Sequence, residues 1–422
     1  MTDALALGID FGTSGARAIA IDSTGAVQAE ASVTFPTTAE NWANLWQEAL
    51  LTLLAELPIA MRQRTGAIAL NGTSSTVLLC DEQGIPLVAP LFYNDDRGKA
   101  GLPTLEAIAP AHHVVLSATS SLAKLLWWRS QPLSYPEPIY FLHQADWLAF
   151  LLHGQLGISD YHNALKLGYD VGELRYPDWM AALSIPFRLP QVVAPGTPIA
   201  TVTEAIAQSL TLPTTCQVCA GTTDSIAAFL ASGARSPGEA VTSLGSTLVL
   251  KLLSTTRVDD ARYGLYSHRL GDLWLVGGAS NTGGAVLRQF FTDAELADLS
   301  AQISPDQESL LDYYPLTKPG ERFPINDPNL QPRLTPRPDN PIEFLHGLLE
   351  SIARIEAQGY QCLQACGATP LTQVYTAGGG AKNLVWAKMR SCHLKVPVSR
   401  ATHTEAAYGT AQLAFNALRT LN

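Results

Sequence analysis

The first strand-turn-strand segment of the chain constrains the fold more than any other feature. Residues 5–10 and 16–22 are apolar and are predicted to pair as strands. The tight turn between them consists of glycines and hydroxyl residues, Gly12, Thr13, Ser14 and Gly15. The tip of such a hairpin exposes backbone N–H groups that can wrap an anionic phosphate. Asp10 is the last residue of the first strand, and its carboxylate can bind the metal ion or take up the proton that accompanies a phosphate. The segment therefore predicts nucleotide chemistry.

The length and charge of the chain indicate how many domains to expect and which partners are not expected. A chain of 422 residues is too long for one compact core, so two domains are expected. The formal net charge is −10 and no cluster of Lys and Arg stands out, so nucleic acid is not an expected partner. No stretch reaches the ~20 apolar residues that span a bilayer, and the start shows no signal-peptide pattern. We therefore expect no membrane partner and a cytoplasmic location.

The six cysteines do not suggest a disulfide framework in so long a chain. Cys216 and Cys219 have the CxxC spacing of a redox or zinc half-site. They lie in an apolar run, and no second CxxC is present to complete four zinc ligands. We therefore favour an ordinary structural role for both residues.

Hydrophobic spacing predicts a β-β-β-α-β pattern in the first part of the chain. A third strand at residues 27–35 follows the hairpin, and apolar residues then recur at helical spacing from Trp42 to Leu53. The further elements expected are strands at 67–70, 78–79 and 87–93 and helices at 121–129 and 144–152. The pattern resembles one half of an actin/hexokinase-type ATPase core.

A second β-rich block begins at Val218 and repeats this organisation. Its expected elements are strands at 239–244, 247–252, 273–276 and 374–376 and helices at 283–291, 340–367, 384–392 and from 404 onward. Its first strands also enclose a turn of glycine and hydroxyl residues, Gly245, Ser246 and Thr247. Two such turns, one in each domain, would face each other across a cleft. The pattern is interrupted at 232–238, which predicts domains of 1–234 and 235–422.

Three more segments could carry chemistry, and each has a plainer alternative. Asp224 begins a predicted helix, where an Asp often serves only as the N-cap. Residues 243–247 form a hydroxyl-rich turn that could equally be an ordinary hairpin. The triple glycine at 378–380 allows a close backbone approach to a flat or anionic ligand, but it could also be a tight strand-to-helix connection.

In this order and at these separations, the four segments resemble the FGGY family of carbohydrate kinases over essentially the whole chain. Residues 278–284 are similar to the family's central segment, and residues 159–163 to a segment near the sugar. Residues 91–97 are similar to its sugar-side motif, with Tyr93 in place of Trp. The resemblance implies an α/β protein with two actin/hexokinase-like (ribonuclease-H-like) domains that flank a nucleotide- and sugar-binding cleft. It also implies a monomer or a homodimer.

The resemblance implies roles for individual residues. Asp224 would be the catalytic base that accepts the proton of the attacking sugar hydroxyl. Asp10, the second catalytic acid, would organise Mg²⁺ through water together with the phosphate, and would also contact the sugar. The residues implied in binding ATP are Gly12, Thr13 and Ser14 in one domain, Gly245, Ser246 and Thr247 in the other, and Gly378, Gly379 and Asn383 against adenine and ribose. The other residues implied on the sugar side are Ser74, Asn94 and Asp95.

The choice of sugar depends on two departures from the usual family pattern. Xylulose kinases of this family usually carry a His where this chain has Ser74, and 422 residues is short for the family. Both features resemble the compact xylulokinase-like D-ribulokinases of cyanobacteria and plants. We therefore expect phosphorylation of D-ribulose to D-ribulose 5-phosphate, with D-xylulose and then other polyols as alternatives. Asn94 and Asp95 could instead belong to a salt-bridged surface loop.

Functions of another class remain open at this point. The same core fold serves Hsp70-like chaperone ATPases and actin-like filament proteins, and fold alone does not decide between them. A sugar or nucleotide sensor without turnover is a further alternative. Asp224 favours a kinase, because a base directed at a substrate hydroxyl has no use in a filament, and the presence of both acids argues against a sensor.

Overall fold

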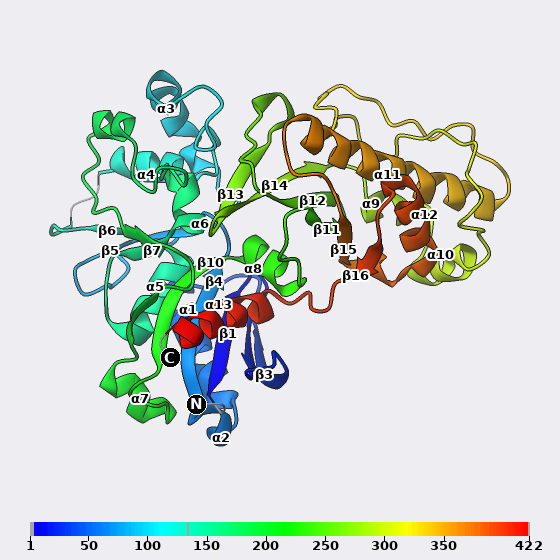
Figure 1. Ribbon diagram of the computed structural model, residues 1–422. Coiled ribbons are helices and arrows are strands. Elements are labelled where there is room, and N and C mark those ends of the chain that lie inside the picture. Colours follow the sequence, from blue (N-terminus) through cyan, green and yellow to red (C-terminus); the bar gives the residue numbers. More distant parts are fainter. Residues whose placement is uncertain (1–3, 133–134, 421–422) are drawn as a thin grey trace. The chain divides into compact units, whose positions relative to one another are not determined.

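Two six-stranded mixed sheets, one in each of two units, organise the chain (Figure 1). The computed structural model describes residues 4–132 and 135–420. Unit 1 contains the chain up to Ala231 and again from Glu405, and unit 2 contains Ser232–Thr404. The expected α/β class with two domains is confirmed.

The sheet of unit 1 has the strand order β3-β2-β1-β4-β10-β9. Its strands are β1 (Leu5–Phe11), β2 (Gly15–Ile21), β3 (Val27–Thr34), β4 (Thr65–Gly72), β9 (Pro198–Thr201) and β10 (Gln217–Thr223). β1 and β2 form the predicted antiparallel hairpin, and β2 pairs in the same sense with β3. β1, β4 and β10 run parallel. The carboxyl ends of these three strands therefore lie at one edge of the sheet, the edge where open α/β sheets bind ligands.

The remaining elements of unit 1 surround this sheet. Its helices are α1 (Trp42–Glu56), α2 (Ile59–Arg62), α3 (Leu102–Ile108), α4 (Ser121–Arg129), α5 (Gln144–His153), α6 (Tyr161–Ala164), α7 (Glu204–Leu210), α8 (Asp224–Ala231) and α13 (Ala406–Thr420). Short 3₁₀ helices are η1 (Arg97–Gly101), η2 (Leu165–Leu167) and η3 (Asp178–Leu183). Two small sheets pair β5 (Val77–Cys80) with β6 (Tyr140–His143) and β7 (Ile158–Asp160) with β8 (Gln191–Val193).

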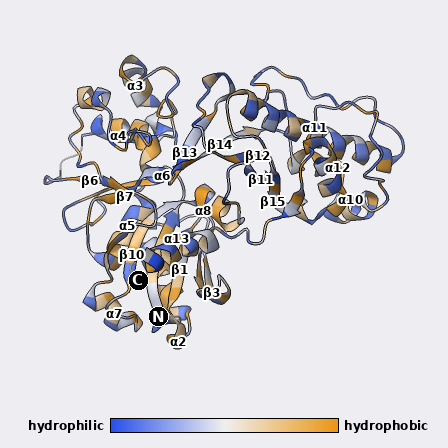
Figure 2. Cartoon of the chain, in the orientation of Figure 1, coloured by the Kyte–Doolittle hydropathy of each residue, from blue (hydrophilic) through white to orange (hydrophobic). Residues whose placement is uncertain are grey.

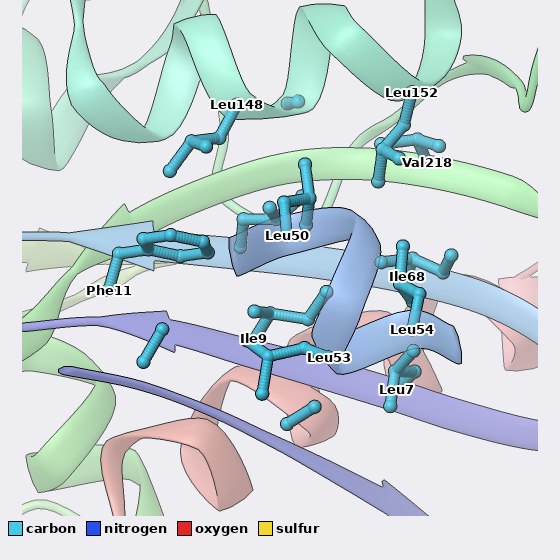
Figure 3. Packing of buried hydrophobic residues seen from close by; sticks show 14 of the residues in the cluster. Leu7, Ile9, Phe11, Leu50, Leu53, Leu54, Ile68, Leu148, Leu152 and Val218 are labelled. Carbon is cyan, nitrogen blue, oxygen red and sulfur yellow. The ribbon is translucent and has the colours of Figure 1, made fainter. Parts of the chain in front are cut away.

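Alternate residues of β1 face two different helical layers. Leu7 and Ile9 pack against α1 and α5 in the main core of unit 1 (Figure 3). Ala6 packs on the opposite face against the small residues of α13. Gly8 lies on that face too, and a Cβ there would come within 2.1 Å of the carbonyl oxygen of Ala407. Since side chains alternate along a strand, Asp10 shares the face covered by α13.

The last helix packs in unit 1, apart from the rest of the expected second domain. The expected second domain, 235–422, included this helix, but α13 packs on β1 and on α8 in unit 1. Gly409 permits the contact with α8, because a Cβ there would lie 1.9 Å from the carbonyl oxygen of Ala227. Figure 2 shows α8 mostly in the hydrophobic colour, and α8 is buried at Ile226 and Phe229. Local sequence patterns do not reveal that the chain returns to its first unit.

The sheet of unit 2 has the order β13-β14-β12-β11-β15-β16, with β11, β15 and β16 parallel. Its strands are β11 (Glu239–Leu244), β12 (Leu248–Ser254), β13 (Tyr266–Leu270), β14 (Leu273–Ser280), β15 (Gln373–Ala377) and β16 (Val398–Arg400). Its helices are α9 (Gly284–Leu287), α10 (Asp293–Ser300), α11 (Pro341–Ala365) and α12 (Leu384–Leu394), with the 3₁₀ helices η4 (Ala261–Tyr263) and η5 (Gly379–Lys382). The helix predicted at 340–367 is α11, and its apolar residues Leu345, Leu349, Ile352, Ile355 and Leu363 are buried in the core of this unit.

Two local predictions differ from the structure. The strand predicted at 87–93 is absent, and only Leu91 forms an isolated bridge, with Val77. Pro86 and Pro90 lack the N–H that a strand ladder needs, which explains the loop. The helix predicted at 283–291 is shortened to α9. In the described part of the chain, every helix is too short or too polar to span a bilayer.

Candidate active site

The acids singled out in the sequence lie at the carboxyl ends of the parallel strands of unit 1. Asp10 of β1 is in register with Asn71 of β4, and Asn71 with Thr222 of β10. Two residues later Asp224 begins α8, and its Oδ1 accepts a hydrogen bond from the amide of Ser225 at 2.6 Å. The structure thus brings Asp10 and Asp224 into one polar cluster.

Burial and two nearby acids make ionisation of the Asp10 carboxyl unfavourable. Burial, then the charges of Asp224 and Glu405, raise the pKa of Asp10 to about 7. The charge of Arg17 and a hydrogen bond with Asn71 act in the opposite direction. The buried Oδ1 atom of Asp10 has no hydrogen-bond partner. A buried oxygen in this state suits a cation or its water ligand, which would also favour the ionised form.

Sequence reasoning missed two charged residues beside Asp10. Arg17 lies directly opposite Asp10 in the hairpin, and its guanidinium forms an ion pair with Glu405 just before α13. The hairpin register could have identified Arg17, because residues opposite each other in an antiparallel pair point to the same face. No local signal could have identified Glu405, which is 388 residues from its partner.

The hairpin turn of unit 1 is exposed at the same edge. The amide of Gly12 donates to the carbonyl of Gly15 at 3.0 Å, and the carbonyl of Ser14 accepts from the amide of Phe35 at 2.9 Å. The side chains of Thr13 and Ser14 are exposed. Gly15 is required by packing, since a Cβ there would lie 2.4 Å from the carbonyl oxygen of Val33. The turn therefore presents hydroxyls on a firmly held backbone.

The sugar-side candidates lie on two neighbouring loops of unit 1. Ser74 is half-buried in the turn that follows β4, and Asn94 is exposed in the loop after Leu91. Asp95 forms an ion pair with Arg97 at 2.5 Å. Burial acts to raise the pKa of Asp95, but the hydrogen bonds and charge of Arg97 and the charge of Lys124 lower it below its usual value. The salt bridge considered for this loop is thus present, and Asp95 stays ionised.

A buried polar layer lies beside these loops. Asp160 is fully buried and caps α6, accepting from the amides of His162 and Asn163 at 2.8 and 3.0 Å. Burial, with the charge of Asp146, raises the pKa of Asp160 to about 7. The ring of His162 also contacts Thr222 Oγ1 at 2.8 Å. The segment 159–163 is therefore a helix cap that braces β10, rather than an open surface turn.

The turn at 245–247 in unit 2 is held by the segment before α9. The amide of Gly284 donates to the carbonyl of Gly245 at 2.9 Å, and Arg288 Nη2 donates to Ser246 Oγ at 3.0 Å. Gly283 has φ +142°, and a Cβ there would lie 2.8 Å from the backbone of Thr247. The segment similar to the family's central motif thus supports this turn.

The glycine turn after β15 packs directly on the end of β11. Gly378 has φ +83°, and a Cβ there would lie 2.7 Å from the carbonyl oxygen of Leu244. Gly379 has open space around it. Asn383 caps α12, accepting from the amide of Trp386 at 2.9 Å, and its amide group donates to Ser300 Oγ at 2.8 Å. Unit 2 therefore brings the 245–247 and 378–380 turns together.

The two cysteines of the CxxC pair lie in the core of unit 1. Cys216 and Cys219 are both buried. Burial raises the pKa of both thiols, that of Cys219 to about 12. Over residues 4–132 and 135–420, no group of three or more His, Cys, Asp or Glu side chains is placed to hold a metal ion.

Comparison with known proteins places the whole chain in one family. The N-terminal domain of the FGGY family of carbohydrate kinases matches residues 5–231, and its C-terminal domain matches residues 240–418. A xylulose kinase from Staphylococcus epidermidis is 24% identical over 96% of this chain and 86% of its own length.

Solved structures show the same fold. A xyloylose kinase from Brucella ovis superposes with a TM-score of 0.85 at 22% identity, over 99% of this chain and 91% of that protein. A xylulose kinase from Rhodospirillum rubrum superposes with a TM-score of 0.83 at 23% identity, over 97% of this chain and 89% of that protein.

Proposed function

This chain belongs to the FGGY family of carbohydrate kinases, phosphotransferases with an alcohol group as acceptor, and we propose that it phosphorylates D-ribulose with ATP to give D-ribulose 5-phosphate. The observation that carries the proposal is the pair of acids at the strand ends of unit 1. Asp224 and Asp10 are close enough for the charge of one to raise the pKa of the other.

In the proposed reaction Asp224 acts as the general base. Its carboxylate accepts the proton of the sugar O5 hydroxyl as that oxygen bonds to the γ-phosphorus of ATP. The bond between the γ-phosphorus and the β–γ bridging oxygen breaks, and ADP leaves with the bond's electron pair. Little covalent chemistry is asked of the protein, because phosphoryl transfer depends mainly on positioning and electrostatic stabilisation.

Asp10 is proposed to hold Mg²⁺ through water. Its buried, unpartnered Oδ1 fits a magnesium-bound water, since Mg²⁺ keeps several of its waters and prefers carboxylate oxygens. When bound, the ion would neutralise phosphate charge. Arg17, opposite Asp10, adds a guanidinium at the same edge of the sheet. This set can offset the charge of ATP in a protein of net charge −10.

The turns are proposed to bind the rest of ATP through backbone groups and hydroxyls. Gly12, Thr13 and Ser14 would contact phosphate from unit 1, and Gly245, Ser246 and Thr247 from unit 2. Gly378, Gly379 and Asn383 would contact adenine and ribose. The open space beside Gly379 suits a flat ring, and the Asn383 amide is already oriented by its helix cap.

The sugar is proposed to be D-ribulose because of Ser74, with Asn94 and Asp95 as further sugar-side residues. A small half-buried hydroxyl at the end of β4 can both donate to and accept from a sugar hydroxyl. D-Xylulose is the second candidate, because the Staphylococcus epidermidis relative is a xylulose kinase. The two sugars differ in the orientation of one hydroxyl, which a site discriminates by whether its buried polar groups find partners.

The test is a coupled ATP-consumption assay with Mg²⁺ over D-ribulose, D-xylulose, L-ribulose, gluconate and glycerol. We expect the highest kcat/KM with D-ribulose, a 5-phosphate product, and slow ATP hydrolysis without sugar. A preference for another acceptor would overturn the choice of sugar. Equal ATP turnover with and without every acceptor would overturn the kinase proposal in favour of a plain ATPase, and binding without turnover would favour a sensor.

A further inference from the structure

A lysine in the interior of unit 1 lies between the two loops that carry the sugar-side candidates. Lys124 is in the middle of α4, and its side chain is fully buried. Burial, with the charges of Lys166 and Arg97, lowers the pKa of Lys124 to about 7, against the opposing charge of Asp95. A cationic side chain placed where its charge is disfavoured requires specific partners.

The partners of Lys124 are backbone carbonyls of both loops. Nζ donates to the carbonyl of Ser75 at 2.8 Å and to the carbonyl of Phe92 at 2.6 Å. Ser75 follows Ser74 in the turn after β4, and Phe92 comes two residues before Asn94. One ammonium group therefore joins the residues 73–76 to the residues 92–95.

The same two loops are joined at a second point that does not involve Lys124. Thr76 Oγ1 accepts a hydrogen bond from the amide of Tyr93 at 3.0 Å. The amide of Thr73 donates to Gln144 Oε1 at 3.1 Å, which holds the first loop to the start of α5. Beside the backbone bridge between Val77 and Leu91, the two loops therefore have two separable side-chain ties, one charged and one neutral.

Helix α4 also supports the far end of the second loop. The guanidinium of Arg97 lies 4.7 Å from the ring centroid of Trp127, which is three residues beyond Lys124 on α4. Arg97 in turn pairs with Asp95. A Cβ on Gly98 would collide with Ala123, so η1 packs closely on this helix. The loop 92–97 is thus held to α4 at both of its ends.

We propose that Lys124 is a positioning residue for the sugar: by binding the carbonyls of Ser75 and Phe92, it holds the loops of Ser74 and Asn94 at the spacing that the acceptor requires. This inference rests on the proposed function and assigns it a residue that no sequence motif singled out. Lys124 acts through the loops and touches no reacting atom.

The experiment compares Lys124→Met with the parent protein and with Lys99→Met, a matched change at an exposed lysine of η1. Methionine keeps an unbranched apolar stem, slightly shorter than that of lysine, and donates no hydrogen bond. We expect the KM for D-ribulose, or for D-xylulose if that is the accepted sugar, to rise at least about tenfold. The KM for ATP should change less than threefold, and Lys99→Met should behave as the parent protein. An unchanged sugar KM in folded Lys124→Met would overturn the proposal.

Hydrogen exchange measured by mass spectrometry gives a readout that does not depend on the sugar. Lys124→Met should speed amide exchange in both 73–76 and 92–97. Thr76→Val, which removes the neutral tie and the hydrogen bond between Thr76 Oγ1 and Thr73 Oγ1, should do so less. If no sugar is phosphorylated by the parent protein, the proposed function falls and Lys124 is judged on exchange alone. Unchanged exchange in both segments would then overturn the proposal. If the methionine variant does not fold, Lys124→Leu, whose apolar side chain also donates no hydrogen bond, is judged by the same criteria.

Discussion

The two units contain sheets of the same design with different residues at the strand ends. In each, antiparallel strands are followed by parallel ones, as in β2-β1-β4-β10 and β12-β11-β15-β16. In unit 1 the parallel strands carry carboxylates at their ends, Asp10 of β1 and Asp224 just after β10, in addition to the glycine turn at 12–15. In unit 2, β11 and β15 run into the glycine turns at Gly245 and Gly378. In each unit the shared topology brings the ends of the parallel strands together. The residues at those ends decide whether carboxylates or mainly backbone groups are presented there.

The units also differ in what lies behind these strands. In unit 1, Gly8 of β1 approaches the backbone of α13, a contact that only small residues allow. In unit 2, a buried ion pair between Glu356 of α11 and Arg390 of α12 binds the paired residues Thr242 of β11 and Thr376 of β15. Close packing brings Asp10 within reach of the charge of Glu405, just before α13, whereas the ion pair of unit 2 supports the strands that lead into two turns.

The largest effect is expected when the proposed general base of unit 1, Asp224, is replaced. Asp224→Asn should lower kcat by about 10² to 10⁴, the usual contribution of a general base, with little change in ATP binding. Asp272→Asn, a matched change at an exposed turn of unit 2, should leave kcat as it is. Steady-state kinetics and ATP titration measure both. Retention of full turnover in Asp224→Asn would show that the base is another residue.

The second-largest effect is expected when the buried ion pair of unit 2, Glu356 with Arg390, loses its cation. Arg390→Met leaves the Glu356 carboxylate buried without its cation, and we expect a loss of about 3–5 kcal/mol in the free energy of unfolding. Arg333→Met removes the exposed pair with Asp312 and should cost less than about 1 kcal/mol. Urea unfolding followed by circular dichroism measures both. Equal losses for the two variants would contradict the role given to the buried pair.

A third effect concerns the pH dependence of stability and tests Asp10 of unit 1. The pKa of Asp10 is raised to about 7 in the folded protein from 3.8 in the unfolded chain, so the folded state holds a proton that the unfolded state releases between these values. The contribution of Asp10 to stability therefore falls as pH rises from about 4 to 7 and stays low above 7.

Asp10→Asn removes this ionisation. The variant should be inactive yet more stable than the parent at pH 8, by up to a few kcal/mol, because a difference of one in pKa corresponds to about 1.4 kcal/mol. The gain should vanish near pH 4. Thermal unfolding at a series of pH values without Mg²⁺ measures it, and a gain that grows toward low pH would have the wrong sign.

The smallest effect tests the glycine turn of unit 2. Gly378→Ala places a Cβ at φ +83° and 2.7 Å from the Leu244 carbonyl, which should cost about 1–3 kcal/mol of stability and raise the KM for ATP more than that for sugar. Gly379→Ala meets no neighbouring atom and serves as the stability control. Similar losses of stability in both variants would refute the packing argument.

Many of the elements that the two units share could be predicted from the sequence, because they depend on local patterns of residues. Apolar runs around glycine and hydroxyl turns located both hairpins, and the Asp224 segment indicated a strand followed by a helix. The strand at 87–93 was wrongly predicted because the apolar pattern outweighed two prolines that cannot join a ladder. The roles of Lys124 and Arg390 could not be predicted, since a lone charged residue in a helix is normally exposed.

The sequence by itself determined which residues end the strands, because side chains alternate with period two and turns need particular residues. The sequence therefore located Asp10, Asp224 and the glycine turns at Gly245 and Gly378 at the ends of strands. Only the tertiary structure decided that α13 returns to unit 1, that Glu405 reaches Arg17, and that Lys124 joins two loops. These are contacts between residues far apart in the chain, and burial, which sets the pKa of Asp10 and of Lys124, exists only once the chain has folded.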